Sequence, residues 1–236
     1  MCIRDSPFSV EDDVVCVPIN ELPKMAVPNA DYCVVGGGKT GMDACLWLLE
    51  QGVAASSIRW VRPRDSWILN RANIQPGELS KPTTESFAQQ LSLIGGSANS
   101  SEAFDKLSKA GILWRLDERI DPTMYRCATI TESEYLALKE ITQVIRKGHV
   151  VSIDKSGLQM DGGSEAVPKG TIYISCASDG LAKRPIQPIF SGNNLCLQTV
   201  RFCQQVFSAA FIAKVEISQR GELEKNELCT VVPHPD

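Results

Sequence analysis

Residues 33–43 read CVVGGGKTGMD, and this stretch carries two phosphate-binding patterns on the same glycines. The GKT at residues 38–40 matches the end of the triphosphate loop GxxxxGK[ST], whereas Gly36, Gly38 and Gly41 match the dinucleotide pattern GxGxxG. The triphosphate loop needs its first glycine at position 33, where this chain has a cysteine inside the apolar run YCVV. The sequence therefore favours the dinucleotide pattern.

The segments on both sides of this loop predict one β-α-β unit over residues 31–62. YCVV (32–35) is typical of a buried strand, MDACLWLLEQG (42–52) of an amphipathic helix closed by a glycine, and SSIRWVR (56–62) of a second strand. In such a unit the glycine turn lies at the amino end of the helix, whose free N–H groups and dipole favour phosphate. We therefore expect a Rossmann-like fold.

Each glycine of the pattern has its own expected task. The first allows the tight turn, the second lets the backbone approach a pyrophosphate, and the third lets the helix pack closely on the strand. Lys39 and Thr40 are expected above the pyrophosphate, and Asp43 is expected in the first turn of the helix, where its charge interacts favourably with the helix dipole. The predicted cofactor-binding residues of the loop are Gly36, Gly37, Gly38, Lys39, Thr40 and Gly41.

The residues after the second strand predict which nucleotide binds. An acidic residue there holds the ribose 2′-hydroxyl of NAD, whereas arginine accommodates the 2′-phosphate of NADP. This strand ends in Arg62-Pro63-Arg64-Asp65, so we expect NADP, with Arg62 as the first candidate and Arg64 as the second; Asp65 leaves NAD open. The flanking Trp60 and Trp67 are expected to pack rather than to stack on adenine.

The rest of the chain predicts an insertion and a return to the sheet. Helical patterns at residues 84–94, 101–110 and 133–145 indicate a helical insertion. Strands are expected at 149–153, 157–160 and 171–176, the first two joined by the turn DKSG and the last two by a connection over residues 161–170. A continuous apolar helix is expected over residues 195–217 and should be buried against a large partner.

Composition excludes several classes of protein. The 236 residues carry a net charge of −4, which gives no basic surface for nucleic acid or an anionic membrane, and no apolar run is long enough to span a bilayer. Nine cysteines without a CxxC pair predict free thiols in a reducing, cytoplasmic compartment, and most lie in apolar runs where a thiol is expected to pack as a small hydrophobe. With two histidines the sequence predicts no metal site, and no catalytic side chain is assigned.

The runs VVGGGKTGMDACLWLLEQG (34–52) and IRWVRPRDSW (58–67) resemble the NADPH-binding domain of two-dinucleotide flavoproteins. The resemblance is to flavin-containing-monooxygenase-like FAD/NAD(P)-dependent oxidoreductases. It extends over most of residues 15–220 and is specific in residues 31–65. It implies a three-layer α/β fold of the ββα type, with NADPH passing hydride to FAD and a small-molecule substrate reacting at the reduced flavin.

The same resemblance implies a division of the chain. Residues 1–27 are expected to be an adapter-like MCIRDS and a connecting segment, 28–170 the NAD(P)-binding domain with its insertion, and 171–236 the C-terminal part of an FAD-binding domain. Strand 171–176 then resembles the family's return strand, and the small-residue turn after it adds Ser178, Asp179 and Gly180 to the expected cofactor contacts. Since the family's FAD-binding GxGxxG is missing here, we expect a fragment whose FAD-domain sequence, or an oligomer partner, completes the fold.

Two alternatives of other classes stay open at this stage. The chain could be a non-catalytic module that senses NAD(P) without flavin. It could also be a short-chain-type NAD(P) dehydrogenase, because Tyr135 and Lys139 have the Tyr-x-x-x-Lys spacing of that class. The expected helical character of residues 81–145 favours a chance match for this pair.

Overall fold

The computed structural model describes residues 8–25, 30–178, 185–201, 204–219 and 221–232. The chain divides into two compact units, residues 1–178 and 179–236, and each is described by itself. Within the described residues, no helix combines the length and the apolarity that crossing a membrane requires.

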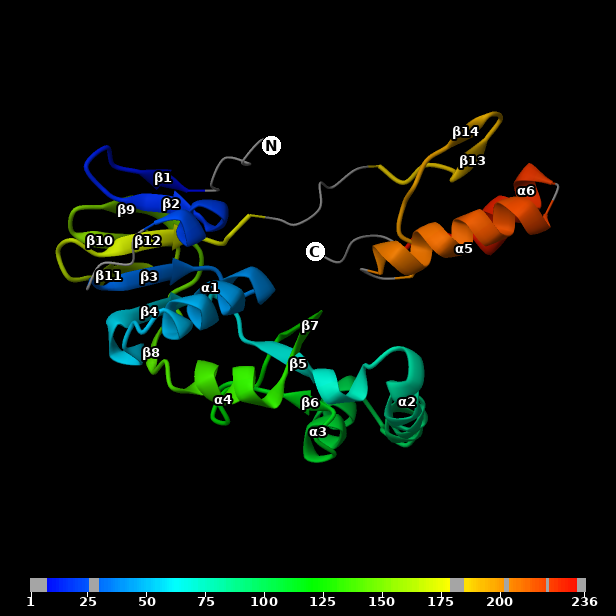
Figure 1. Ribbon diagram of the computed structural model, residues 1–236, viewed down its shortest axis with the longest axis horizontal. Coiled ribbons are helices and arrows are strands. Elements are labelled where there is room, and N and C mark those ends of the chain that lie inside the picture. The colour runs from blue at the N-terminus through cyan, green and yellow to red at the C-terminus, as the bar shows by residue number, and fades with distance from the viewer. Residues whose placement is uncertain (1–7, 26–29, 179–184, 202–203, 220, 233–236) are drawn as a thin grey trace. The chain divides into compact units, whose positions relative to one another are not determined.

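Unit 1 is built on a five-stranded, fully parallel sheet. Its strand order is β2-β12-β3-β4-β8 (Figure 1), with bounds Cys16–Pro18, Ile172–Ser175, Tyr32–Val35, Ile58–Val61 and Gln143–Ile145. Helix α1 (Lys39–Glu50) connects β3 to β4, which pair in parallel. The α/β class and the β-α-β unit over residues 31–62 are thus confirmed.

Alternate residues of the central strands enter two different cores. On β3, Tyr32 and Val34 pack with α1, whereas Cys33 and Val35 pack on the opposite face. Because both faces are covered, the strand consists entirely of buried residues, as parallel strands generally do. Cys33 is fully buried among apolar side chains, so the expected packing of this thiol as a small hydrophobe is confirmed.

The face away from α1 is covered by a second sheet of order β1-β9-β10-β11. The bounds are Ser9–Val10, Val150–Asp154, Gly157–Met160 and Gly163–Ala166. The expected DKSG turn joins β9 to β10, and Asp154 Oδ1 accepts hydrogen bonds from the backbone N–H groups of Ser156 and Gly157. The sequence interpretation treated residues 161–170 as a connection, but this segment contains β11.

The insertion between β4 and β8 is mixed, and the expectation of a helical insertion was wrong in this respect. It contains a three-stranded sheet of order β6-β5-β7, with bounds Leu113–Trp114, Ser66–Asn70 and Met124–Ile130. Helices α2 (Ser80–Gly95), α3 (Ser100–Lys109) and α4 (Glu132–Lys139) complete it. The first two confirm the expected helices at 84–94 and 101–110.

The predicted helix at 133–145 is too long, because its last residues form a strand. Helix α4 starts with a capping box between Thr131 and Glu134 and ends at Lys139. Residues 143–145 are β8, the edge strand that pairs with β4. Ile145 there is buried on the face away from α1, and this burial favours the extended conformation over the helix.

Unit 2 contains a short hairpin and two helices. The bounds are Phe190–Ser191 for β13, Asn194–Leu195 for β14, Gln205–Ser218 for α5 and Glu222–Leu228 for α6. The predicted helix over 195–217 was therefore wrong in its first part. Leu195 pairs with Phe190 in the hairpin, and Thr199 exchanges backbone and side-chain hydrogen bonds with Val232, so these residues are held extended.

The division between the units falls after Ser178, eight residues later than the expected boundary at 170. The reason is β12, which pairs with β2 on one side and β3 on the other and so lies inside the parallel sheet. In the part of the chain that the structure describes, four short 3-10 helices complete the elements: η1 Ile19–Lys24, η2 Ala55–Ser57, η3 Arg71–Asn73 and η4 Gly77–Leu79.

Candidate functional site

The glycine loop lies at the carboxyl end of β3, and two of its glycines have no room for a side chain. Gly36 has φ of 136°, and a Cβ there would come within 2.4 Å of the carbonyl oxygen of Cys176. A Cβ on Gly41 would come within 2.0 Å of the carbonyl oxygen of Gly36. The first glycine therefore makes the turn beside β12, and the third brings α1 onto the turn.

A tryptophan on β4, the strand beside β3, holds this turn in place by a hydrogen bond. The indole Nε1–H of Trp60 donates a buried hydrogen bond of 2.8 Å to the carbonyl oxygen of Gly36. The backbone N–H of Gly36 in turn donates to the carbonyl of Val61 at 3.1 Å. Trp60 is fully buried in the core under α1, so its expected packing role is confirmed. Sequence reasoning missed the hydrogen bond because only the fold brings Trp60 under the loop.

The amino end of α1 is open above the turn. Gly38 is the N-cap residue, is exposed, and provides no side chain to cap the helix; a Cβ on it would meet no heavy atom within 4 Å. The first N–H groups of a helix have no acceptor within the helix, and the dipole there favours an anion. Thr40 is exposed beside Gly38. This part of the loop can therefore be approached by a phosphate.

Lys39 is half-buried and forms an ion pair with Asp43 one turn along α1. The first turn of α1 contains no acidic residue, so the sequence-based placement of Asp43 in that turn was wrong. Since Asp43 neutralises Lys39 in part, the attraction for an anion comes mainly from the backbone of the loop.

Arg62, the first candidate for a 2′-phosphate, is buried directly after β4. Its side chain is 5% exposed, and a Cβ on Gly37 would lie 3.4 Å from the aliphatic part of Arg62. The guanidinium lies 4.8 Å above the Trp60 ring and pairs with Asp65 at 3.3 Å, while its Nε has no hydrogen-bond partner. Burial lowers the pKa of Arg62, and Asp65 opposes this effect. Arg62 therefore supports the loop from within.

Asp65 is shared between two arginines from neighbouring strand ends. Arg146, which follows β8, donates to both carboxylate oxygens of Asp65 at 2.7 and 3.3 Å and to Asp117 at 3.2 Å. The hydrogen bond to Asp65 is the largest cause that raises the pKa of Arg146. Sequence reasoning missed Arg146 because it lies 81 residues from Asp65.

Arg64 differs from Arg62 in that it is exposed. Among the expected contacts after β12, Ser178 is exposed, while Asp179 and Gly180 lie outside the described residues. The structure thus brings β12, the glycine loop and Arg62 together at one edge of the parallel sheet. It leaves Arg64 as the candidate arginine that solvent reaches.

Cys176 directly follows β12 at this edge of the sheet. Its backbone N–H donates to the carbonyl of Val35 at 2.8 Å, which aligns the end of β12 with the loop. Burial raises the pKa of the Cys176 thiol to about 12, so the neutral thiol dominates at physiological pH.

The Tyr135 and Lys139 pair lies on α4. The Tyr135 hydroxyl donates to the backbone carbonyl of Arg115 at 3.1 Å, and its ring stacks on Trp114 with centroids 4.8 Å apart. Lys139 Nζ lies 3.3 Å from the Tyr135 oxygen. These contacts attach α4 to the strand β6.

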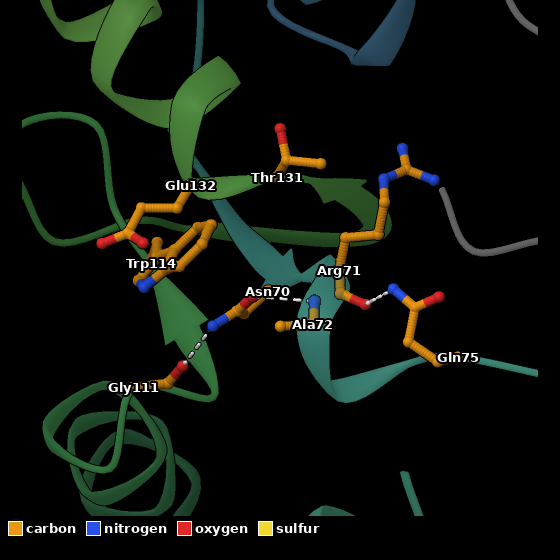
Figure 2. Close-up of a pocket in the computed structure, with 8 residues that line it drawn as sticks. All are labelled: Asn70, Arg71, Ala72, Gln75, Gly111, Trp114, Thr131 and Glu132. Atoms are coloured by element: carbon orange, nitrogen blue, oxygen red, sulfur yellow. Dashed lines mark hydrogen bonds between the residues drawn. The ribbon is translucent and has the colours of Figure 1, made fainter. Parts of the chain in front are cut away.

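Cavities occur in the insertion, and the linings of two of them include no residue of the glycine loop. The larger has a volume of about 380 Å³, and Figure 2 shows its lining, with Trp114 and Glu132 on one side and Gln75 on the other. The Asn70 amide donates to the carbonyl of Gly111 and the Gln75 amide to that of Arg71, so both amides hold the wall together. Among the described residues, no cluster of three or more metal-ligating side chains is present.

Comparison with known proteins gives relatives whose activity is not described. No family model matches the chain. Uncharacterized protein Mb2023 of Mycobacterium bovis and the uncharacterized proteins MT2056 and Rv2000 of Mycobacterium tuberculosis are each 46% identical to it over 235 residues. Each match covers 99% of this chain and 44% of the relative, so the chain spans less than half the length of the curated relatives it matches.

Proposed function

We propose that unit 1 is a Rossmann-like domain that binds a nicotinamide dinucleotide at its glycine loop. The observation that carries this proposal is the different surroundings of the three glycines. Gly36 and Gly41 are packed against backbone, whereas Gly38 between them is open to solvent at the start of α1. These surroundings match the three tasks that dinucleotide binding gives to the glycines of GxGxxG.

The location of the loop supports the same proposal. In parallel α/β sheets, ligands bind at the carboxyl ends of the strands. The loop follows β3, which lies between β12 and β4, and both neighbouring strands end beside it. A pyrophosphate would contact the backbone at residues 37–40, and Lys39 would lie at its edge.

We further propose a preference for NADP(H) over NAD(H). An NAD-binding unit needs an acidic residue free to hold the ribose 2′-hydroxyl. Asp65 is 6% exposed on its side chain and is paired with both Arg62 and Arg146, so its carboxylate is already occupied. Arg64 is exposed at the same strand end and would pair with the 2′-phosphate, while Arg62 would position the loop.

We propose that this domain delivers reducing equivalents in a flavoprotein oxidoreductase of the monooxygenase-like kind. Bound NADPH would supply hydride to FAD, and a small-molecule substrate would react at the flavin. This part of the proposal rests on the resemblance of residues 31–65. The residues of unit 1 would bind and orient the dinucleotide, and the FAD-binding sequence would be supplied by a further domain or another subunit.

We do not assign the short-chain dehydrogenase reaction to this chain. In that reaction the tyrosine hydroxyl must donate its proton to the substrate. Here the hydroxyl of Tyr135 donates to the carbonyl of Arg115, and the ring is covered by Trp114.

The proposal is tested by titrating the chain with NADP⁺ and NAD⁺ and measuring affinity by calorimetry. Gly38→Glu places a carboxylate where the pyrophosphate would lie, in open space and at a φ of −82° that any residue adopts. We expect this variant to fold and to lose dinucleotide binding. Gly95→Glu is the matched control, because Gly95 is also open and lies at the end of α2.

Arg64→Gln tests the choice of nucleotide in the same titration. We expect NADP⁺ affinity to fall by about tenfold, the scale of one charge-assisted contact, with little change for NAD⁺. The proposal is contradicted if the wild-type protein binds neither dinucleotide, or if the Gly38→Glu variant binds them as tightly as the wild type does.

A further inference from the structure

The smaller cavity of the insertion is lined by aromatic rings and carboxylates. It has a volume of about 280 Å³ and shares no residue with the glycine loop. Its walls come from the start of α3, from β5, and from the segment that enters β7. The lining residues are Trp67, Ser100, Ser101, Phe104, Asp105, Asp121, Pro122, Thr123, Met124 and Tyr125.

Three aromatic rings in contact form one wall of this cavity. Trp67 and Phe104 are stacked with centroids 5.5 Å apart and planes 5° from parallel, and Tyr125 meets Phe104 edge-on at 5.7 Å. Trp67 is buried, whereas Tyr125 is 43% exposed. Aromatic faces carry negative charge density and attract cations within about 6 Å of the ring centroid.

The protein already places a cation against this aromatic group. The guanidinium of Arg115 lies 5.2 Å from the centroid of Trp67. It pairs with Asp121 at 2.7 Å and lies 3.8 Å from Asp105. Because 3.8 Å is too long for a hydrogen bond, the carboxylate of Asp105 keeps its capacity to accept hydrogen bonds from a ligand.

The charges that line the cavity have one sign. Asp105 and Asp121 are both carboxylates, and the described lining contains no lysine, arginine or histidine. The amino end of α3 also lies here and would by itself favour an anion. Its cap is occupied, however, because Asn99 accepts from the N–H of Glu102, and the carboxylate of Glu102 accepts from the N–H of Ala98. The acidic first turn therefore offsets the positive end of the helix.

We infer that this cavity binds a small organic ammonium ion, with the ammonium hydrogen-bonded to Asp105 and its alkyl groups against Phe104 and Tyr125. Asp121 is already paired with Arg115 at 2.7 Å and its side chain is 92% exposed, so Asp105 supplies the main attraction for the ammonium. A neutral molecule of the same shape would lose both the ion pair and the cation–π contact. This inference does not depend on the proposed dinucleotide function.

The experiment compares two ligands of the same shape, tert-butylammonium and tert-butanol, by NMR titration of the whole chain. The indole N–H of Trp67 is the reporter, identified among the four tryptophans by its loss in Trp67→Phe. We expect a saturable shift with tert-butylammonium. We expect tert-butanol to bind at least threefold to fivefold more weakly, the effect of one exposed cation–π contact.

Two variants and a control connect that binding to the cavity. Asp105→Asn removes the proposed acceptor charge, and Tyr125→Leu removes an aromatic face. Each variant should lower the affinity for tert-butylammonium by at least about threefold. Glu140→Gln removes one exposed carboxylate outside the cavity and should leave the affinity unchanged. The remaining indole signals verify that each variant is folded. The inference is overturned if wild type shows no saturable shift, if the alcohol binds as well as the ammonium, or if Glu140→Gln weakens binding as much as Asp105→Asn.

Discussion

The indole N–H of Trp60 donates a 2.8 Å hydrogen bond to the carbonyl of Gly36, the same oxygen against which Gly41 packs. One carbonyl thus connects the strand β4, the glycine turn and the helix α1. The second-strand tryptophan is therefore part of the loop's support, and the geometry of the loop depends on it.

Trp60→Phe keeps most of the buried ring and removes this donor. We expect the free energy of unfolding to fall by about 1–3 kcal/mol, because a buried carbonyl loses its partner. Urea unfolding followed by circular dichroism measures the change. Trp47→Phe, in a half-buried position on α1, serves as the control. Equal stability of the two variants would show that the hydrogen bond to Gly36 contributes little.

Alanine should destabilise the protein much more at one glycine of the loop than at another. Gly41→Ala would place a Cβ 2.0 Å from the Gly36 carbonyl, so α1 must move, and we expect a loss of about 1–3 kcal/mol or more. Gly38→Ala meets no neighbour, and replacing glycine by alanine at the N-cap should cost only about 0.5–1 kcal/mol. Thermal unfolding of both variants is the measurement. If Gly38→Ala is the less stable of the two, the assigned tasks are reversed.

The sequence was sufficient for the β-α-β unit because its signals are local. The buried run YCVV, the glycines and the helix pattern lie within 31 consecutive residues, from Asp31 to Val61. The parallel pairing of β3 with β4 follows from that order. The prediction of the turn between β9 and β10 also depended on local residues, since Asp154 accepts hydrogen bonds from the N–H groups of Ser156 and Gly157 in the same turn.

The errors came from short apolar segments whose conformation depends on distant partners. Residues 143–145 fit a helix by periodicity, but β4 provides hydrogen bonds for a strand there. Leu195 fits the start of the long helix, but it pairs with Phe190 across a turn at Gly192. The sequence did not reveal Arg146 as a partner of Asp65 for the same reason, because the two residues are 81 positions apart and only the fold brings them together.

Removing the charge of Asp65 alone from its buried ion pairs should lower the free energy of unfolding strongly. Asp65→Asn leaves the guanidinium of Arg62 buried without its carboxylate, and we expect a loss of about 3–5 kcal/mol. Adding Arg62→Met to this variant should recover part of the loss, because an apolar side chain tolerates the buried position. Arg64→Gln is the exposed control and should change stability by less than about 0.5 kcal/mol. Urea unfolding of the four proteins forms the test, and a stable Asp65→Asn variant would contradict it.

Because of Asp117, the stability of the protein should decrease as the pH falls below about 4. A hydrogen bond from Arg119 is the largest cause that lowers the pKa of Asp117 to about 2, and Arg146 contributes as well. In the unfolded chain the pKa of this carboxyl is about 3.9, so between about pH 4 and pH 2 the unfolded state binds more protons than the folded state. The stabilisation is therefore complete above about pH 4 and is lost as the pH falls through 2.

Arg119→Gln removes the main donor and should flatten this part of the pH profile. Asp117 and Arg119 are joined by two side-chain hydrogen bonds of 3.0 and 3.1 Å, whereas Arg146 retains one contact to Asp117 in the variant. We expect the urea midpoint of wild type to fall more steeply from pH 4 to pH 2 than that of Arg119→Gln. Arg64→Gln, which also removes one exposed arginine charge, should keep the wild-type slope because it leaves Asp117 with its donors. Identical slopes in wild type and Arg119→Gln would show that this pair does not set the acid response.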